Sequence, residues 1–234
     1  MNSEKLSKRL EMVSQYLLKN STFADIGSDH AYLPCYAIKK GLAKYAIAGE
    51  VVEGPYQTAK QQVMECGYES SISVRKGDGL EVLQPNEVDC ITIAGMGGPL
   101  IASILENGKD RLLGVKRLIL QPNIGANHIR NWCVQNNWVI IAEEILEEDE
   151  KIYEIIVAEN NERAEVTHLT DAELLLGPFL MQEKSDVFIK KWSDELKQWR
   201  IILDRMNLAE NQEKIIERKL AIEKNISLVE EVLT

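Results

Sequence analysis

Short apolar runs alternate with amphipathic stretches along the first 160 residues of the chain. The apolar runs predict seven strands, at residues 22–27, 45–51, 72–78, 88–95, 116–122, 138–146 and 151–159. The amphipathic stretches predict helices at residues 5–19, 33–40, 53–66, 98–106 and 126–136. Strands and helices that alternate in this way are typical of an α/β fold, in which helices cover a parallel sheet.

The last two predicted strands are separated by only a few acidic residues, too few for a crossover helix. We therefore expect them to pair as an antiparallel hairpin. A sheet of five parallel strands closed by such a hairpin resembles the Rossmann-like sheet of class I S-adenosylmethionine-dependent methyltransferases. At this point the resemblance is one of fold.

The pattern changes to nearly continuous helix after about residue 165. Thr170 and Asp171 can cap a short helix, which Gly177 and Pro178 interrupt. Two heptad-like stripes follow, made by Phe188, Trp192, Leu196, Trp199, Leu203 and Met206 and then by Leu208, Ile215, Ile222, Ile226 and Val229. We expect a catalytic domain at 1–162 and a helical coiled-coil domain at 163–234. The coiled coil is either a substrate-gripping arm or a structural or dimerising module, and a monomer or weak homodimer fits both.

Composition and charge indicate the class of protein and its cellular compartment. With 45% hydrophobic and 27% charged residues, the chain has the make-up of an ordinary globular protein. It has no long uncharged apolar run, and charges are spaced through its N-terminus, so we expect a cytoplasmic protein with no membrane partner. Its 4 cysteines are scattered with no CxxC pair, which suggests neither a metal site nor a disulfide framework.

The net charge of -10 argues, taken alone, against a nucleic-acid partner. The acids are unevenly placed, however, because the stretch EEILEEDE at 143–150 holds many of them. This leaves room for a locally basic face, with Lys5, Lys8 and Arg9 among its candidates. Charge alone does not separate that face from ordinary solvated lysines and arginines.

The strongest local signal is ADIGSDHAYLP at 24–34, where an apolar strand ends in an acid and a glycine and runs into a helix. Gly27 allows a tight turn against a ligand. The GxGxxG pattern of a dinucleotide site is absent, and a pyrophosphate would meet the Asp29 carboxylate. A cationic ligand such as S-adenosylmethionine would instead be favoured there. The motif indicates a nucleoside cofactor site, and a structural strand-to-helix turn is the alternative.

Two further acids follow the next strands. Glu50 ends the second strand, where a carboxylate can accept hydrogen bonds from both ribose hydroxyls of an adenosine. Asp78 and Gly79 follow the third strand, although GDG alone is a common turn. Because parallel strands end at one edge of the sheet, the three acids should meet where ligands of open α/β folds bind.

The fourth and fifth strands lead into IAGMGGPL at 93–100 and LILQPN at 118–123. The glycines allow close backbone approach to a ligand, and the amides of Gln121 and Asn123 can bond a base or simply end a strand. The Asp/Asn-Pro-Pro-aromatic motif of many amino-group methyltransferases is absent, which disfavours a plain exocyclic-amine mechanism.

Together, ADIGSDHAYLP, GEV, GDGL, IAGMGG and LILQPN, in this order and before a helical tail, resemble the bacterial tRNA adenine-22 N1-methyltransferase family. The resemblance implies methyl transfer from S-adenosylmethionine to N1 of adenine 22 in tRNA. Asp29 is the candidate catalytic residue, because it should lie where cofactor and target base meet and its carboxylate can hydrogen-bond the 6-amino group. The resemblance also implies a cofactor pocket lined by Asp25, Gly27, His30, Glu50, Val51, Asp78, Gly79, Gly95 and Met96. The candidates for RNA contact are Lys5, Lys8, Arg9 and Asn123.

The sequence leaves three alternative classes of function. A methyltransferase for another RNA position or for a small molecule would share the cofactor pocket. A NAD-dependent oxidoreductase is disfavoured by Asp29, and a non-catalytic scaffold would make the strand-end acids and glycine loops coincidental. Cofactor binding separates the last two classes from a methyltransferase, because a methyltransferase binds S-adenosylhomocysteine and ignores NAD.

Overall fold

The computed structural model describes residues 5–160, 168–207 and 216–234. The chain divides into two compact units, Met1–Thr167 and His168–Thr234. The expected boundary between residues 162 and 163 lies outside the described residues.

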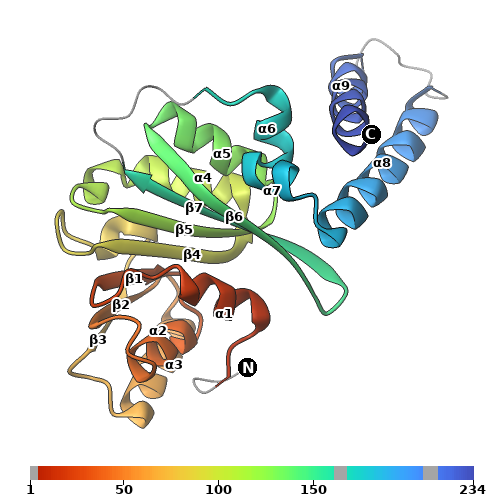
Figure 1. Ribbon diagram of the computed structural model, residues 1–234. Coiled ribbons are helices and arrows are strands. Elements are labelled where there is room, and N and C mark those ends of the chain that lie inside the picture. Colours follow the sequence, from red (N-terminus) through yellow and green to blue (C-terminus); the bar gives the residue numbers. More distant parts are fainter. Residues whose placement is uncertain (1–4, 161–167, 208–215) are drawn as a thin grey trace. The chain divides into compact units, whose positions relative to one another are not determined.

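The first unit is built on a seven-stranded mixed sheet in the order β3-β2-β1-β4-β5-β7-β6 (Figure 1). The first five strands are parallel, and β7 runs antiparallel to both β5 and β6. The expected closing hairpin is therefore confirmed. The strands are β1 Thr22–Ile26, β2 Tyr45–Glu50, β3 Ile72–Lys76, β4 Cys90–Gly97, β5 Arg117–Ile124, β6 Trp138–Glu148 and β7 Lys151–Asn160.

Helices cover both faces of this sheet. Helices α1, α2 and α3, in the red and orange part of the chain, cover one face of the sheet, and α4 and α5 cover the other (Figure 1). The helices are α1 Lys8–Gln15, α2 Tyr32–Lys39, α3 Glu53–Cys66, α4 Gly98–Asn107 and α5 Ala126–Gln135, with short 3₁₀ turns η1 Gly79–Val82 and η2 Lys109–Leu112. Apolar residues of the central strands, among them Phe23, Ile91 and Leu118, are fully buried between these layers.

Helix α1 is shorter than the apolar pattern predicts. The expected helix spans residues 5–19, but Ser7 caps the first turn by accepting a hydrogen bond from the Leu10 amide. At the other end, the Tyr16 amide bonds the Val13 carbonyl, so the chain tightens out of the α-helix. The apolar residues on either side, Leu6 and Leu17, remain buried without being helical.

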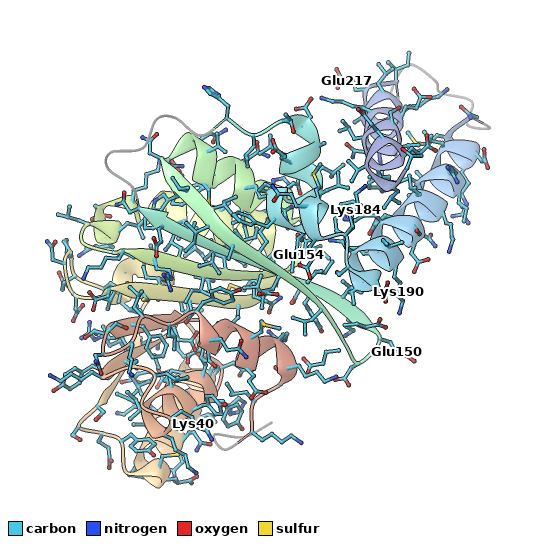
Figure 2. All side chains as sticks on the ribbon, in the orientation of Figure 1. Lys40, Glu150, Glu154, Lys184, Lys190 and Glu217 are labelled. Carbon is cyan, nitrogen blue, oxygen red and sulfur yellow. The ribbon has the colours of Figure 1, made fainter. Side chains whose placement is uncertain are left out.

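A buried ion triad ties α5 to the hairpin. Arg130 of α5 is fully buried and bonds Glu143 of β6 at 2.6 Å and Glu154 of β7 at 2.5 Å. Figure 2 labels Glu154 within the hairpin and Glu150 at its tip. Burying charged groups costs free energy because they lose their contact with water. Pairing the Arg130 guanidinium with two carboxylates offsets this cost. The triad joins three elements of the fold.

The second unit is helical. It contains α6 Asp171–Leu176, α7 Pro178–Glu183, α8 Asp186–Asn207 and α9 Ile216–Leu233. Thr170 caps α6 as its sequence predicts, and α8 and α9 contact each other. Within the α8 stripe, Phe188, Trp192 and Leu196 are buried, and the later members are half-buried. Leu208 and Ile215 of the second stripe lie outside the described residues.

Candidate active site

The strand order reverses direction at β1, whose neighbours are β2 and β4. Such a switch point leaves a crevice at the carboxyl ends of the strands, where open α/β sheets bind ligands. A pocket of about 190 Å³ lies there. It is lined by Arg9, Leu10, Asp25, Gly27, Ser28, Asp29, Ala94, Gly95 and Met96. Segments from α1, β1 and β4, far apart in sequence, thus meet at one pocket.

Asp25 anchors the loop that follows β1. Its carboxylate is buried and accepts hydrogen bonds from the Ser28 hydroxyl at 2.6 Å and the Thr92 hydroxyl at 2.7 Å. Burial raises the pKa of Asp25, and the two hydroxyl hydrogen bonds act against that rise. Ser28 and Thr92 therefore hold this acid in the pocket wall.

The loop adopts a left-handed backbone over several residues. Gly27 has φ +69°, and Asp29, His30 and Ala31 have φ values of 39°, 69° and 54°. Three successive non-glycine residues in this region are strained, a feature that clusters at functional sites. A Cβ added to Gly27 would lie 2.2 Å from Cε of Met96, so the glycine allows the β1 and β4 loops to approach closely.

Asp29 and His30 face outward from this loop. The Asp29 side chain is 74% exposed, and its Oδ1 lies 3.3 Å from Nε2 of His30. The imidazole also stacks on the ring of Tyr32, with centroids 5.2 Å apart. His30 is thereby held between the loop and α2, while the Asp29 carboxylate remains available to a ligand.

Glu50 links the ends of β2 and β1. Its Oε1 accepts a hydrogen bond of 2.5 Å from the backbone amide of Asp29, and the side chain is buried. Burial raises the pKa of Glu50, the Asp29 amide opposes this rise, and the negative charges of Asp25 and Asp29 add to it. The structure thus brings the first two predicted strand-end acids together.

The third strand end forms a neighbouring hollow. Asp78 and Gly79 line a pocket of about 300 Å³ together with Leu100 and Ile104 of α4. The Gly77 amide bonds the Glu50 carbonyl at 2.9 Å, which joins this strand end to that of β2. Val51, the other predicted residue here, has 55% of its surface exposed.

A polar network surrounds Gly95 at the end of β4. The buried Gln121 accepts hydrogen bonds through Oε1 from the Gly95 amide and from Arg9. Asn123, an exposed residue, donates to the Gly95 carbonyl at 2.8 Å. Of the predicted RNA-contact residues, Arg9 therefore lines the pocket, and Asn123 contacts its Gly95 turn.

The remaining predicted RNA contacts, Lys5 and Lys8, are exposed on and before α1. The start of α1 is fixed by the hairpin, because the Glu148 carboxylate accepts a hydrogen bond of 2.6 Å from the Lys8 amide. A carboxylate at a helix N-terminus is favourable. Part of the acidic stretch at 143–150 therefore holds α1 in place beside the pocket.

Sequence reasoning missed the supporting residues Ser28, Thr92 and Tyr153. Thr92 is fully buried in β4, and a hydroxyl inside an otherwise apolar strand is a signal for a buried hydrogen bond. The Tyr153 ring lies 5.4 Å from the Arg9 guanidinium, a contact between α1 and β7 that no local pattern reveals.

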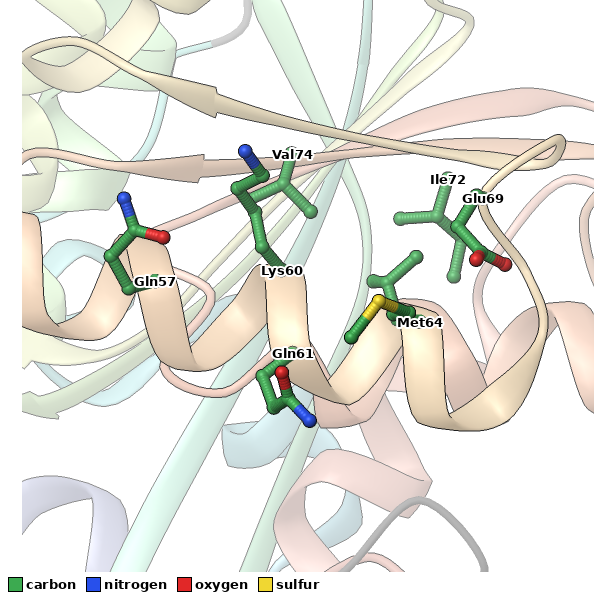
Figure 3. A pocket seen from close by; sticks show the side chains of 8 residues that line it. Gln57, Lys60, Gln61, Met64, Glu69, Ile72 and Val74 are labelled. Atoms are coloured by element: carbon green, nitrogen blue, oxygen red, sulfur yellow. The ribbon is translucent and has the colours of Figure 1, made fainter.

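A separate hollow of about 370 Å³ lies between α3 and β3 (Figure 3). Met64, Ile72 and Val74 give it an apolar floor, and Lys60 and Glu69 stand among its polar residues. It contains none of the predicted site residues. The strand-end pocket is therefore the candidate active site.

Within residues 5–160, 168–207 and 216–234, no group of three or more His, Cys, Asp and Glu side chains is placed to hold a metal ion. No helix in the same part of the chain is long and apolar enough to cross a bilayer.

The sheet order and the strand-end pocket are those of the Rossmann-like fold that class I methyltransferases share. The family described as TrmK, tRNA (adenine(22)-N(1))-methyltransferase, matches residues 23–231. The chain is 50% identical over 235 residues to the tRNA (adenine(22)-N(1))-methyltransferase of Bacillus subtilis (strain 168), covering 100% of this chain and 99% of that protein. The chain therefore belongs to the tRNA (adenine(22)-N(1))-methyltransferase family.

Solved structures agree with this assignment. The chain is similar to the crystal structure of the Bacillus subtilis M1A22 tRNA methyltransferase TrmK, with a TM-score of 0.93, 49% identity, and coverage of 99% of this chain and 100% of that one. It is also similar to a Streptococcus pneumoniae protein in complex with S-adenosyl-L-methionine, with a TM-score of 0.87, 41% identity, and coverage of 98% and 100%. The chain is an S-adenosylmethionine-dependent methyltransferase of this family.

Proposed function

We propose that this protein methylates N1 of adenine 22 in tRNA and that the strand-end pocket carries the reaction. The observation that supports this site is the meeting of Glu50, Asp29 and the Gly95 turn at one edge of the sheet. The relatives named above are tRNA (adenine(22)-N(1))-methyltransferases by their own descriptions.

The residues at the pocket fit the cofactor. Because Gly27 has no side chain, the Met96 methyl group can occupy the place where a Cβ would lie, and the β1 and β4 loops meet closely at the pocket. In this proposal Glu50 accepts hydrogen bonds from the ribose hydroxyls, and Asp78 and Gly79 with Val51 border the adenine. Asp25, His30, Gly95 and Met96 complete the walls. When bound, S-adenosylmethionine supplies an electrophilic methyl group on a sulfonium.

Asp29 is the proposed catalytic residue. N1 of adenine is a neutral ring nitrogen with a lone pair, so no side chain has to remove a proton before it attacks. The exposed Asp29 carboxylate accepts a hydrogen bond from the 6-amino group and stabilises the positive charge that develops on the ring. His30 orients the loop through its contacts with Asp29 and Tyr32. The remaining rate acceleration comes from positioning.

The target adenine has to leave its stack in the folded tRNA to reach the pocket, which costs a few kcal/mol. Binding elsewhere on the tRNA has to offset this cost. The exposed Lys5 and Lys8 are proposed to contact phosphates, and Arg9 and Asn123 to contact RNA at the pocket rim.

The finer organisation belongs to the same proposal. Residues 1–162 form the catalytic domain, and residues 163–234 form a helical coiled-coil domain that assists tRNA binding. The contact between α8 and α9 and the ion pair of Arg200 with Glu230 support a folded-back helix pair. We further propose that the enzyme works in the cytoplasm, because tRNA is its substrate, as a monomer or weak homodimer.

Methyl transfer to a defined transcript tests this function. Labelled S-adenosylmethionine is supplied with a tRNA transcript carrying A22 and with one in which that adenine is guanine. Label in the first transcript alone is the expected result. Label in both transcripts would indicate that the enzyme methylates another RNA position. Label in neither, with S-adenosylhomocysteine still bound, would favour a small-molecule substrate.

A further inference from the structure

The turn at Gly95 is held by side chains of the neighbouring strand. The register between β4 and β5 shifts between Ala94 and Met96, and Gly95 has φ +80°. Its amide donates to Oε1 of Gln121 at 3.0 Å, and its carbonyl accepts from Nδ2 of Asn123 at 2.8 Å. Two β5 side chains thus satisfy both backbone polar groups of the bulged residue.

The same Gln121 oxygen also holds Arg9. Nη1 of Arg9 donates to it at 2.5 Å, while the guanidinium stacks over the ring of Tyr153. Gln121 is fully buried, and its amide nitrogen donates to Oδ1 of Asn123 at 3.3 Å. One amide therefore joins a turn from β4, a helix from the N-terminus and the end of β5.

Both groups that Gln121 holds line the strand-end pocket. Arg9 and Gly95 stand beside Asp29 and Met96 there. The Arg9 guanidinium lies 3.6 Å from where a Gly95 side chain would begin. A movement of the Gln121 oxygen would shift the turn and the guanidinium together, and a misplacement of about 1 Å near reacting groups can slow a reaction roughly 100-fold.

We propose that Gln121 is a positioning residue for methyl transfer, acting through the Gly95 turn and Arg9. This inference rests on the proposed function of the pocket. Gln121 contributes to the rate of the chemical step more than to cofactor affinity, because the groups that it holds, Arg9 and Gly95, stand beside Asp29 in the pocket, whereas Glu50 is the residue assigned to the cofactor ribose.

Single-turnover methyl transfer at saturating tRNA separates this role from a structural one. Gln121→Leu removes the acceptor oxygen at similar size, and Gln121→Glu retains it. We expect Gln121→Leu to slow transfer by about tenfold or more, and by a clearly larger factor than it raises the dissociation constants for S-adenosylhomocysteine and tRNA. We expect Gln121→Glu to recover most of the rate.

Two more variants keep the test decisive if Gln121→Leu folds poorly. Asn123→Ala alters an exposed residue and releases the Gly95 carbonyl, so a slower chemical step is again expected. Asn131→Ala, which removes a similar amide-to-carbonyl bond within α5, is the control and should act like wild type.

A wild-type rate in both Gln121→Leu and Asn123→Ala would overturn the role of Gln121 alone. An equal loss of transfer rate in Gln121→Leu and Gln121→Glu, accounted for by lost cofactor affinity, would also overturn that role. A wild-type enzyme that labels no A22 transcript in the same series would instead overturn the proposed function, and the role of Gln121 with it.

Discussion

Oε1 of Glu50 lies 2.5 Å from the backbone amide nitrogen of Asp29, so the end of β2 holds the loop that carries the proposed catalytic acid. Glu50 thus has two tasks in this account: it receives the cofactor ribose and it fixes the Asp29 backbone. Hydrogen bonds to charged groups contribute about 1.5–3 kcal/mol, or roughly tenfold or more in affinity.

Glu50→Gln is expected to weaken S-adenosylhomocysteine binding by about tenfold or more, as measured by calorimetry. The amide oxygen can still accept from Asp29, but the negative charge beside the ribose is lost. Glu53→Gln is the matched control, because Glu53 is an exposed acid that pairs with Lys76 at the start of α3. Equal affinities of wild type and Glu50→Gln would contradict the assignment.

The same substitution should not destabilise the free protein at neutral pH. Burial raises the pKa of Glu50, so the folded state holds this proton more tightly than the unfolded state does. Ionised Glu50 therefore lowers stability above its folded pKa, and this cost fades as the pH falls through that pKa. We expect Glu50→Gln to have a Tm at pH 7 equal to or above that of wild type, with the difference shrinking in acid. A lower Tm at pH 7 would contradict this.

Gly27→Ala tests the close approach of the two loops. The added Cβ meets Met96 at 2.2 Å, and φ +69° is unfavourable for alanine by about 1–2 kcal/mol. Gly41→Ala is the control, since Gly41 has φ +65° with nothing within 4 Å. Both variants should lose similar stability in thermal unfolding, whereas only Gly27→Ala should lose cofactor affinity. An equal loss of cofactor affinity in both variants would contradict a role in cofactor binding for the close approach of Gly27 to Met96.

Arg130→Met is expected to destabilise the protein by about 3–5 kcal/mol, because it leaves Glu143 and Glu154 buried without their guanidinium. Urea unfolding measures this loss. Lys116→Met breaks the more exposed pair with Asp89 in the same unit and should shift the midpoint little. Similar midpoints for both variants would show that the triad is not a principal support of the hairpin.

Lys8→Glu is expected to weaken tRNA binding and to reduce its salt dependence by about one charge, while leaving S-adenosylhomocysteine affinity intact. Lys44→Glu is the control, because Lys44 precedes β2 and so lies at the opposite edge of the sheet from the pocket. Filter binding over a salt series provides both slopes. An unchanged affinity in Lys8→Glu would rule out the exposed start of α1 as an RNA contact.

Much of the fold follows from local pattern. The apolar runs predicted all seven strands and their closing hairpin, and α3 begins at Glu53 and ends at Cys66 as its periodicity indicated. Such features depend on short-range spacing, which the sequence displays directly. The grouping of Asp29 with Glu50 was also predictable, because parallel strands end at one edge.

Non-local contacts were beyond prediction. The double role of Gln121 depends on a bulge at Gly95 and on Arg9, which lies 112 positions earlier in the chain. The capping of α1 by Glu148 likewise joins distant segments of the chain. The sequence alone therefore showed the acidic stretch at 143–150 as a concentration of charge and did not reveal that it caps a helix. Composition and spacing do not reveal which buried polar groups meet.

The catalytic role of Asp29 is tested by the single-turnover rate of Asp29→Asn with A22 tRNA, measured beside its affinities for S-adenosylhomocysteine and tRNA. Asparagine tolerates the left-handed backbone at this position, so the change removes charge with little strain. We expect Asp29→Asn to slow methyl transfer by about 100-fold or more with both affinities retained. A wild-type rate, or a slow rate explained entirely by lost cofactor affinity, would contradict the catalytic role of Asp29.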